Sequence, residues 1–251
     1  MTSNPREVNS LKITAMKRWT PLSAIVGIGL VAAYLSAQAP AEFTVEKIAD
    51  NLVVIKDTND GNTAVLIRAD GVVLVDTKSL KGGQRLLDLL RIVTPKPVTH
   101  ILHTHHHYDH TGGNSFFPSH VEVIAQENAA ARMPSMVEFN TPERKHGLPD
   151  RTFKDKLTLF SGVDAIEMYY FGPAHTDNDA FIVFRGFSVM HAGDTAPGMN
   201  ATPHGGSADA YPSTMSRAAA IVGVRTVIPG HGPLMTWQQF TDNVAALSKR
   251  Q

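Results

Sequence analysis

The sequence predicts an α/β fold, and three observations support this prediction. The chain has 251 residues, 43% of them hydrophobic and 18% charged, which suits a globular domain of layered helices and strands. Short β-branched runs alternate with segments of helical spacing, and strands followed by a helix occur twice, which suggests two similar halves. Polar clusters follow several predicted strands, where α/β sheets usually carry their sites.

Charge and cysteine content exclude several functions. Lysines plus arginines number 23 and acidic residues also number 23, so no net field favours nucleic acid or an anionic membrane. Nucleic acid is therefore not an expected partner. The chain has no cysteine, which excludes disulfides, thiol catalysis and zinc held by cysteine. Any bound metal must be held by nitrogen and oxygen atoms.

The first 41 residues have the pattern of an export segment. Lys17 and Arg18 precede an apolar stretch, residues 22–35, which small residues follow and which is short for a membrane span. We therefore expect residues 1–41 to be a signal peptide or an N-terminal anchor, and residues 42–251 to form one domain. The expected location is periplasmic or secreted, with the membrane contacted only through that segment.

The first half of the domain predicts an antiparallel meander followed by a helix. The β-branched runs are separated by the turn signals Asn59-Asp60-Gly61 and Ala69-Asp70-Gly71. Leucines then recur at helical spacing until Pro95, and a short apolar strand follows Pro97. The expected strands are residues 52–55, 63–68, 72–75 and 98–102, and the expected helix is 79–93.

The second half begins with a strand over 121–125 and a helix that runs to residue 132. Residues 133–153 lack periodicity and are expected to form a loop that borders the site. The tight loop 229–233 separates the last strand from the last helix. The further expected strands are 165–171, 180–184, 187–191 and 226–228, and the further helices are 208–222 and 237–249.

Residues 103–110 are the strongest functional signal in the chain. They read His-Thr-His-His-His-Tyr-Asp-His, and Gly112 and Gly113 follow them. Glycines disfavour a helix, so this run is typical of a ligand loop rather than of a packed element. A catalytic zinc site needs neutral imidazoles and carboxylates from several loops, with one position open for water. The run therefore predicts a metal site.

The segment from His105 to His110 resembles the H-x-H-x-D-H signature of the metallo-β-lactamase superfamily. The loop around His175, the pair Gly193-Asp194 and the loop Pro229-Gly230-His231-Gly232 resemble its remaining ligand motifs, in the same order. The resemblance covers most of the chain from Phe43 onward. It implies a metallo-hydrolase domain, folded as a four-layer αβ/βα sandwich with a dinuclear metal site in the groove between the layers.

The resemblance also implies which residues hold the metals. Two Zn²⁺ ions per chain are the expected cofactors, and a hydroxide held between them is the expected nucleophile, because zinc lowers the pKa of bound water towards about 7. Asp109 is the expected catalytic residue, orienting the hydroxide and later carrying a proton. The expected ligands are His105, His107 and His175 for the first metal, Asp109, His110 and His231 for the second, and Asp194 bridging both.

The other histidines and acids are expected to play supporting roles. Asp76 ends a strand and, by the resemblance, is expected either to support the ligand loop or simply to cap the strand. His106 occupies a variable position of the motif, and His191 ends a strand just before Asp194, where it could orient a ligand. Surface or hydrogen-bonded core positions are expected for His100, His103, His120, His146 and His204, and turn positions for Asp177 and Asp179.

We expect an exported zinc-dependent hydrolase that cleaves an ester, thioester, lactone or amide bond of a small molecule. Aspartate at position 194 resembles the thioesterase and lactonase branches of the superfamily. One lactamase branch has cysteine there and a lysine three residues further on, where this chain has Pro197. β-Lactam hydrolysis stays open as an alternative. A mononuclear-iron persulfide dioxygenase, using His105, His175 and Asp194, and a non-catalytic metal-binding protein are further alternatives.

Overall fold

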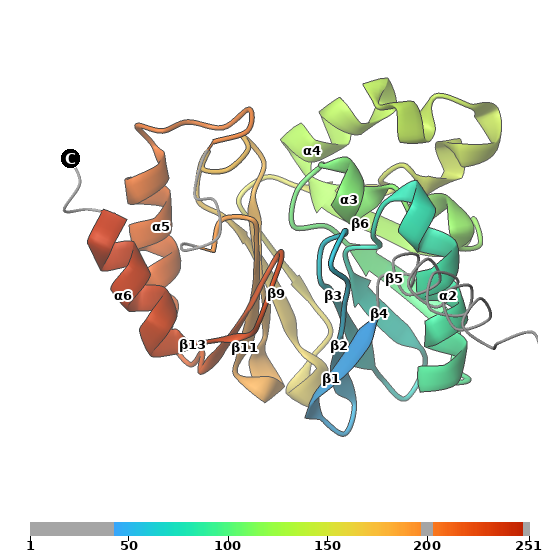
Figure 1. Cartoon of the computed structure of the whole chain (residues 1–251), viewed down its shortest axis with the longest axis horizontal. Coiled ribbons are helices and arrows are strands. Elements are labelled where there is room, and N and C mark those ends of the chain that lie inside the picture. Colours follow the sequence, from blue (N-terminus) through green and yellow to red (C-terminus); the bar gives the residue numbers. More distant parts are fainter. Residues whose placement is uncertain (1–42, 197–202, 248–251) are drawn as a thin grey trace, which may run out of the picture. The chain divides into compact units, whose positions relative to one another are not determined.

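A computed structural model of the chain describes residues 43–196 and 203–247 (Figure 1). All of them belong to one compact unit, Ala41–Gln251. The predicted export segment and Pro197 lie outside the described residues, so the expectations that depend on them stay predictions. None of the described helices is long and apolar enough to cross a membrane.

Two β-sheets form the centre of this unit. The first has seven strands in the order β1-β2-β3-β4-β5-β6-β7. Strands β1 to β4 pair in antiparallel fashion, as the predicted meander requires, whereas β4 to β7 pair in parallel. The strands are β1 Thr44–Ala49, β2 Leu52–Lys56, β3 Thr63–Ile67, β4 Val72–Val75, β5 Val98–Leu102, β6 Glu122–Gln126 and β7 Arg151–Phe153.

The second sheet has six strands in the order β13-β12-β11-β10-β9-β8. Only the pair of β11 and β12 is parallel among these neighbours. The strands are β8 Lys156–Leu159, β9 Ile166–Tyr170, β10 Ala180–Phe184, β11 Val189–Gly193, β12 Thr226–Pro229 and β13 Met235–Thr236.

Helices cover the outer face of each sheet (Figure 1). On the first sheet lie α2 Leu80–Val93 and α4 Glu127–Arg132, and on the second lie α5 Tyr211–Ala219 and α6 Trp237–Leu247. The histidine-rich run was expected to be a loop, but its end forms the short helix α3, Tyr108–Thr111, in which His110 and Thr111 are buried. The order helix, sheet, sheet, helix confirms the predicted four-layer sandwich. The 3₁₀ helices are η1 Asn114–Phe116, η2 Met133–Ser135, η3 Val137–Phe139, η4 Pro142–Gly147, η5 Gly162–Asp164 and η6 Arg185–Phe187.

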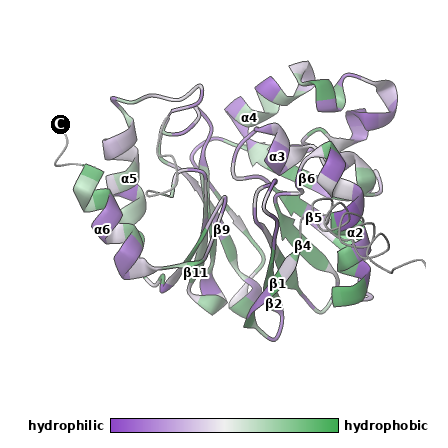
Figure 2. Cartoon of the chain, viewed as in Figure 1, coloured by the Kyte–Doolittle hydropathy of each residue, from purple (hydrophilic) through white to green (hydrophobic). Residues whose placement is uncertain are grey.

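Alternating side chains along the strands build the layers. In β2, Leu52 and Val54 enter the core between the two sheets, whereas Val53 and Ile55 enter the core beneath α2. Strand β10 divides its side chains in the same way between the central core and the core beneath α5 and α6. Because both faces of these strands are buried, they are almost continuously apolar. Figure 2 shows the same for β4, which is coloured as hydrophobic.

Helix α2 begins and ends at the signals that predicted it. The side chain of Ser79 caps it by accepting a hydrogen bond of 3.3 Å from the backbone N–H of Gly82. Leu86 and Leu90 form its buried face against the first sheet. The helix stops at Thr94, before Pro95, which cannot continue the hydrogen-bond ladder.

The sequence analysis missed β1, β7, β8 and the two-residue strand β13. Strand β1 reads Thr-Val-Glu-Lys-Ile-Ala and lies at a sheet edge, where charged residues are common and the apolar signal is weak. Strands β7 and β8 have three and four residues, too few for a clear period. The segment 133–153 was expected to be a loop, but it contains η2, η3, η4 and β7. The 3₁₀ turns were missed because their side chains do not follow the α-helical spacing. The expected helix 208–222 is shorter, Tyr211–Ala219.

Candidate metal centre

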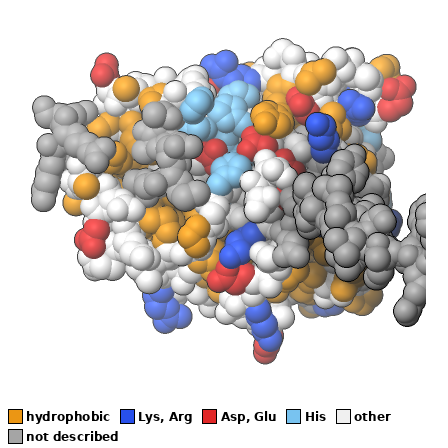
Figure 3. Space-filling view, in the orientation of Figure 1, with side chains coloured by type: hydrophobic (Ala, Val, Ile, Leu, Met, Phe, Trp, Pro, Cys, Tyr) orange, Lys and Arg blue, Asp and Glu red, His pale blue; other side chains and the backbone are white. Residues whose placement is uncertain are grey.

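Seven side chains from four loops meet where strands of both sheets end. The loop after β5 contributes the histidine-rich run, and the loops after β9, β11 and β12 contribute one residue each. Histidine and acidic side chains gather here in the middle of the face shown in Figure 3. These seven are the residues that the sequence analysis expected at the metals: His105, His107, Asp109, His110, His175, Asp194 and His231.

The first ligand group consists of His105, His107, His175 and Asp194, and one donor atom of each lies within 4.8 Å of the others. His107 Nδ1 lies 3.1 Å from His105 Nε2 and 3.2 Å from His175 Nε2. Asp194 Oδ2 lies 3.6 Å from His175 Nε2. Three imidazole nitrogens and a carboxylate thus surround a space that could hold a metal ion.

The second ligand group consists of Asp109, His110 and His231, again with donor atoms within 4.8 Å of one another. Asp109 Oδ2 lies 3.0 Å from His231 Nε2 and 3.6 Å from His110 Nε2. Asp194 reaches this group as well, because its carboxylate oxygens lie 3.3 Å from His110 Nε2 and 3.6 Å from His231 Nε2. Asp194 therefore lies between the groups, at the place expected of a bridging residue.

Two buried atoms in the centre fit a bound metal. His110 Nε2 and Asp194 Oδ1 are buried 3.3 Å apart and, besides this ion-pair contact, have no hydrogen-bond partner among the described residues. A buried polar atom without a partner costs about 1–3 kcal/mol, so folded proteins rarely keep one without a reason. A cation bound to both atoms would remove this cost. The donors are imidazole nitrogens and carboxylate oxygens, which suit zinc.

Two histidines of the first group, His105 and His107, are held neutral. Burial, and after it the charges of the neighbouring His106 and His175, lower the pKa of His107 to about 4. Burial likewise lowers the pKa of His105 well below its usual value. A neutral imidazole has a free lone pair, so at neutral pH this group offers nitrogens that can bind a metal without first losing a proton.

The second group holds its histidines protonated in the absence of metal. Hydrogen bonds to Asp109 and Asp194 raise the pKa of His231 to about 9. Burial alone would lower the pKa of His110, but Asp194 and Asp76 outweigh it and hold this pKa well above its usual value. Cations at these two positions keep the pKa of Asp194 well below its usual range, although burial opposes them.

Asp76 supports the second group from a fully buried position. Its carboxylate accepts hydrogen bonds from His110 Nδ1 at 2.8 Å, and from Thr104 N and Oγ1 at 2.9 and 2.7 Å. A proton on His110 Nδ1 leaves Nε2 facing the other ligands. Asp76 has a φ of 63°, a left-handed conformation that aspartate tolerates better than most residues. These contacts match the expected support of the ligand loop.

Most of the remaining histidines occupy hydrogen-bonded or surface positions, as expected. His103 is buried between Asp76 and Asn114, and His100 lies 3.3 Å from Glu122. His120 is exposed. His146 bonds to a backbone carbonyl, and Asp177 and Asp179 hold the turn after His175 through contacts with Arg132 and Thr176.

His204 is exposed, as expected, yet it lies at the rim of the first group. Its ring centroid is 5.2 Å from that of His175 and 6.4 Å from that of His107. Its backbone N–H donates to the carbonyl of His175 at 2.6 Å. No local pattern in the sequence distinguishes this histidine from an ordinary surface residue.

Three buried polar residues that the sequence analysis did not single out hold the ligand loops. The side chain of Asn178 accepts a hydrogen bond of 3.0 Å from the backbone N–H of His106, between two ligands of the first group. Asn62 and Lys78 bond to backbone carbonyls near the second group. All three are fully buried. The turn signal around Asn59-Asp60-Gly61 was the only hint of this arrangement.

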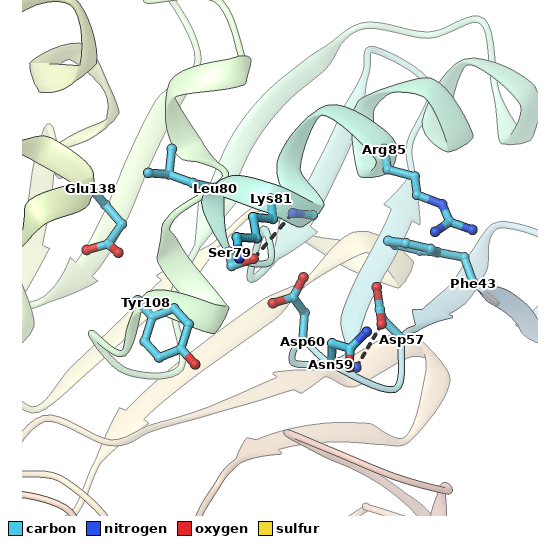
Figure 4. Close-up of a pocket in the computed structure, with 11 residues that line it drawn as sticks. Phe43, Asp57, Asn59, Asp60, Ser79, Leu80, Lys81, Arg85, Tyr108 and Glu138 are labelled. Carbon is cyan, nitrogen blue, oxygen red and sulfur yellow. Dashed lines mark hydrogen bonds between the residues drawn. The ribbon is translucent and has the colours of Figure 1, made fainter. Parts of the chain in front are cut away.

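Two cavities lie near residues of the centre. The larger, of about 680 Å³, has Tyr108 and Glu138 on one side and Phe43 and Arg85 on the other, and none of the seven ligands lines it (Figure 4). Tyr108 directly precedes a ligand, and Glu138 belongs to the segment 133–153 that was expected to border the site. The smaller cavity, of about 380 Å³, is lined by His231 itself. The centre thus has room beside it for a small molecule.

Comparisons with known proteins agree with this fold and centre. The sequence profile of the metallo-beta-lactamase superfamily matches residues 57–231. The chain is 30% identical over 183 residues to metallo-beta-lactamase domain-containing protein 1 of Xenopus laevis, a match that covers 69% of this chain and 71% of that protein. It is 23% identical over 177 residues to a type 2 metallo-beta-lactamase of Bacillus cereus, covering 68% of this chain and 66%, just under two thirds, of that protein.

Solved structures show the same architecture. The metallo-beta-lactamase from Pontibacter korlensis superposes with a TM-score of 0.71 at 20% identity, covering 82% of this chain and 99% of that one. The DIM-1 metallo-beta-lactamase superposes with a TM-score of 0.69 at 19% identity, covering 84% of this chain and 99% of that one. At such identities the likeness shows a shared fold and nothing about the substrate.

Proposed function

The chain belongs to the metallo-β-lactamase superfamily, and from this premise we propose that it is a zinc-dependent hydrolase acting on a small molecule. Members of this superfamily are mostly hydrolases. The observation that carries the proposal is the meeting of two ligand groups around Asp194, beside a cavity of about 380 Å³ that His231 lines. The proposed bond is an ester, thioester, lactone or amide.

We assign one zinc ion to each ligand group, so that the chain holds two. His105, His107 and His175 would hold the first ion, and Asp109, His110 and His231 the second, with Asp194 shared between them. Bound zinc would polarise the scissile carbonyl and lower the pKa of coordinated water to about 7, which provides a nucleophile at neutral pH.

Asp109 is the proposed catalytic residue. Burial would raise its pKa, but His231 and His110 hold that pKa below its usual value, so the group is a carboxylate at neutral pH. A carboxylate at this position can accept a hydrogen bond from the attacking water, orient it towards the carbonyl and take up its proton. The exposed Tyr108 and the cavity beside it would hold the part of the substrate that does not react.

The proposed location is periplasmic or secreted, and it rests on the sequence pattern of residues 1–41 alone. The proposed partner is a small-molecule substrate, without nucleic acid, because the balanced charge of 23 basic and 23 acidic residues creates no attraction for a polyanion.

β-Lactam hydrolysis is the second candidate. It is supported by the similarity to relatives that are named metallo-beta-lactamases. Aspartate at position 194 favours the broader proposal, because the resemblance links it to thioesterases and lactonases. A single bound iron ion would instead favour the persulfide dioxygenase alternative.

A hydrolysis panel on the zinc-loaded full chain tests the proposal. The panel contains a cephalosporin, a penem, an acyl-lactone, a thioester, a phosphodiester and a sulfate ester, and metal content is measured in parallel. We expect turnover of at least one carboxylic acid derivative with two zinc ions per chain. His105→Ala and Asp109→Ala should abolish it while the fold persists. Full activity in either variant, or one iron ion per chain, would contradict the proposal.

A further inference from the structure

We infer that Gly61 and Asn62, in the loop between β2 and β3, position the second ligand group and not the first, and that Lys78 holds this loop in place. The two residues thereby set the affinity for the second metal ion. This inference rests on the proposed dinuclear site and concerns how the chain builds one half of it.

Asn62 fixes the backbone that carries His231. Its side-chain Nδ2 donates to the carbonyls of Pro229 at 2.9 Å and Gly232 at 3.0 Å, and its backbone N–H donates to the carbonyl of Gly230 at 2.5 Å. The three carbonyls flank His231 on both sides. Asn62 is fully buried, so water does not compete for these bonds.

His191 anchors Asn62 from the other side. The backbone N–H of Gly193 donates to His191 Nδ1 at 3.2 Å, so the ring proton resides on Nε2. His191 Nε2 then donates to the backbone carbonyl of Asn62 at 3.2 Å. Because His191 belongs to β11, the position of Asn62 is tied to the second sheet as well as to the loop that it contacts.

Gly61 contacts the other two ligands of the second group. Its backbone N–H donates to the carbonyl of Asp109 at 3.1 Å. The imidazole of His110 packs so closely on Gly61 that an added Cβ would lie 2.4 Å from its Cε1 and 2.6 Å from its Nδ1. Only a hydrogen atom fits there, so any larger side chain must displace the ring of His110.

Lys78 fastens the loop to the first sheet. Its Nζ is fully buried with the rest of the residue and donates to the carbonyls of Ile55 at 2.8 Å and Gly61 at 2.5 Å. Ile55 lies in β2, so the ammonium group joins the last turn of the loop to the strand from which it departs. Two charge-assisted bonds in a buried place make this a rigid connection.

The first group is held by a different asparagine. None of the hydrogen bonds of Gly61 or Asn62 within the described part of the chain reaches His105 or His107. Asn178 instead bonds to the backbone N–H of His106, between those two ligands. Asn178 is as deeply buried as Asn62, so its replacement is a matched control for removing an asparagine from the centre.

Zinc titration of the metal-free full chain tests the inference without any substrate. The two binding steps are resolved by calorimetry, native mass spectrometry counts the ions, and circular dichroism checks the fold. Asn62→Ala should keep the first step and weaken the second by about 10- to 100-fold, the usual effect of removing a group that orients a ligand. Gly61→Ala should also weaken the second step, because the added Cβ displaces the ring of His110. This variant retains the backbone hydrogen bonds of Gly61, so its effect isolates the steric contact. Asn178→Ala should not weaken the second step selectively.

The outcomes separate this inference from the proposed function. If the unaltered chain binds a single ion, the dinuclear proposal fails and the inference fails with it. If it binds two ions, and Gly61→Ala and a folded Asn62→Ala bind both as tightly, the inference alone is overturned. A selective loss of the second ion in Asn178→Ala would also overturn it. Should Asn62→Ala not fold, Gly61→Ala decides between support and contradiction.

Discussion

The two ligand groups share Asp194 but differ in their charge before metal binds. In the first group, burial lowers the pKa of His107 to about 4 and that of His105 well below its usual value, so these two imidazoles are neutral. In the second group, carboxylates raise the pKa of His231 to about 9, so its imidazoles carry protons. The first group is thus ready to accept a cation, whereas the second must exchange protons for one. Neighbours of similar composition can differ in function because burial and charge pairing act in opposite directions.

The largest expected difference between the groups lies in which ion is lost when one ligand is removed. His107→Ala and His231→Ala should each lower kcat/KM by at least about 10³-fold, because metal catalysis supplies several kcal/mol of transition-state stabilisation and about 1.4 kcal/mol is tenfold in rate. Metal analysis should find one zinc ion left in His231→Ala, held by the first group. His107→Ala instead removes a ligand of the first group, so the ion lost should be the first one.

His100→Ala is the matched control for that pair of variants. His100 is half-buried in β5 and contacts Glu122 rather than either ligand group. Its replacement should leave both ions and the activity in place. Two retained ions in His231→Ala, or equal metal loss in all three variants, would contradict the division into two groups.

The next difference concerns pH. A ligand whose pKa is about 9 must release a proton when zinc binds near neutral pH, and each such proton weakens apparent binding about tenfold per pH unit below that pKa. Lowering the pH from about 8 to about 6 should therefore weaken the second binding step by about 100-fold or more. The first step should change little, because a ligand whose pKa is about 4 is already deprotonated throughout this range.

Calorimetry in two buffers of different ionisation enthalpy measures the protons released at each step. The second zinc equivalent should release at least one proton more than the first. Equal release at both steps would show that the groups do not differ in charge.

The same contrast explains which parts of the centre were predictable from sequence. The imidazole and carboxylate groups of residues 103–110 suggested metal chemistry directly, whereas the full ligand set, with His175, Asp194 and His231, followed from the resemblance to the metallo-β-lactamase superfamily. The layers followed from alternating apolar strands such as β2 and β10. Asn62 and Lys78 were missed because their side chains bond to backbone carbonyls distant in sequence. Every residue has a backbone carbonyl, so the sequence does not mark the partner. The residues Asn59-Asp60-Gly61 predicted a turn, but they did not predict that this turn packs on the loop that carries His231.

Short elements were missed for a related reason. Strand β1 owes its place to pairing with β2 along a sheet edge and has little apolar pattern of its own. The 3₁₀ turns between residues 133 and 147 are likewise stabilised by tertiary contacts. Local pattern therefore predicted the elements that build the cores, and it failed where partners decide the conformation.

Asp76→Asn should have the smallest effect on the difference in zinc binding between the two ligand groups. Asparagine keeps the size of the side chain and tolerates the φ of 63°, so the change removes charge and acceptor capacity without altering the backbone. Asp76 accepts from His110 Nδ1 at 2.8 Å, and it is one of the two carboxylates that raise the pKa of His110. The second zinc step should weaken by about 10- to 100-fold, as for other carboxylates that orient a metal-bound histidine.

The pH dependence of Asp76→Asn distinguishes orientation from general damage. Without the carboxylate, the pKa of His110 falls, so fewer protons compete with zinc and the second step should depend less steeply on pH. Asp150→Asn is the control, because Asp150 also accepts a backbone N–H, from Val123 at 2.9 Å, but contacts no ligand. It should bind both ions normally. A folded Asp76→Asn chain with unchanged second-step affinity and slope would show that His110 is oriented by the ligand groups themselves.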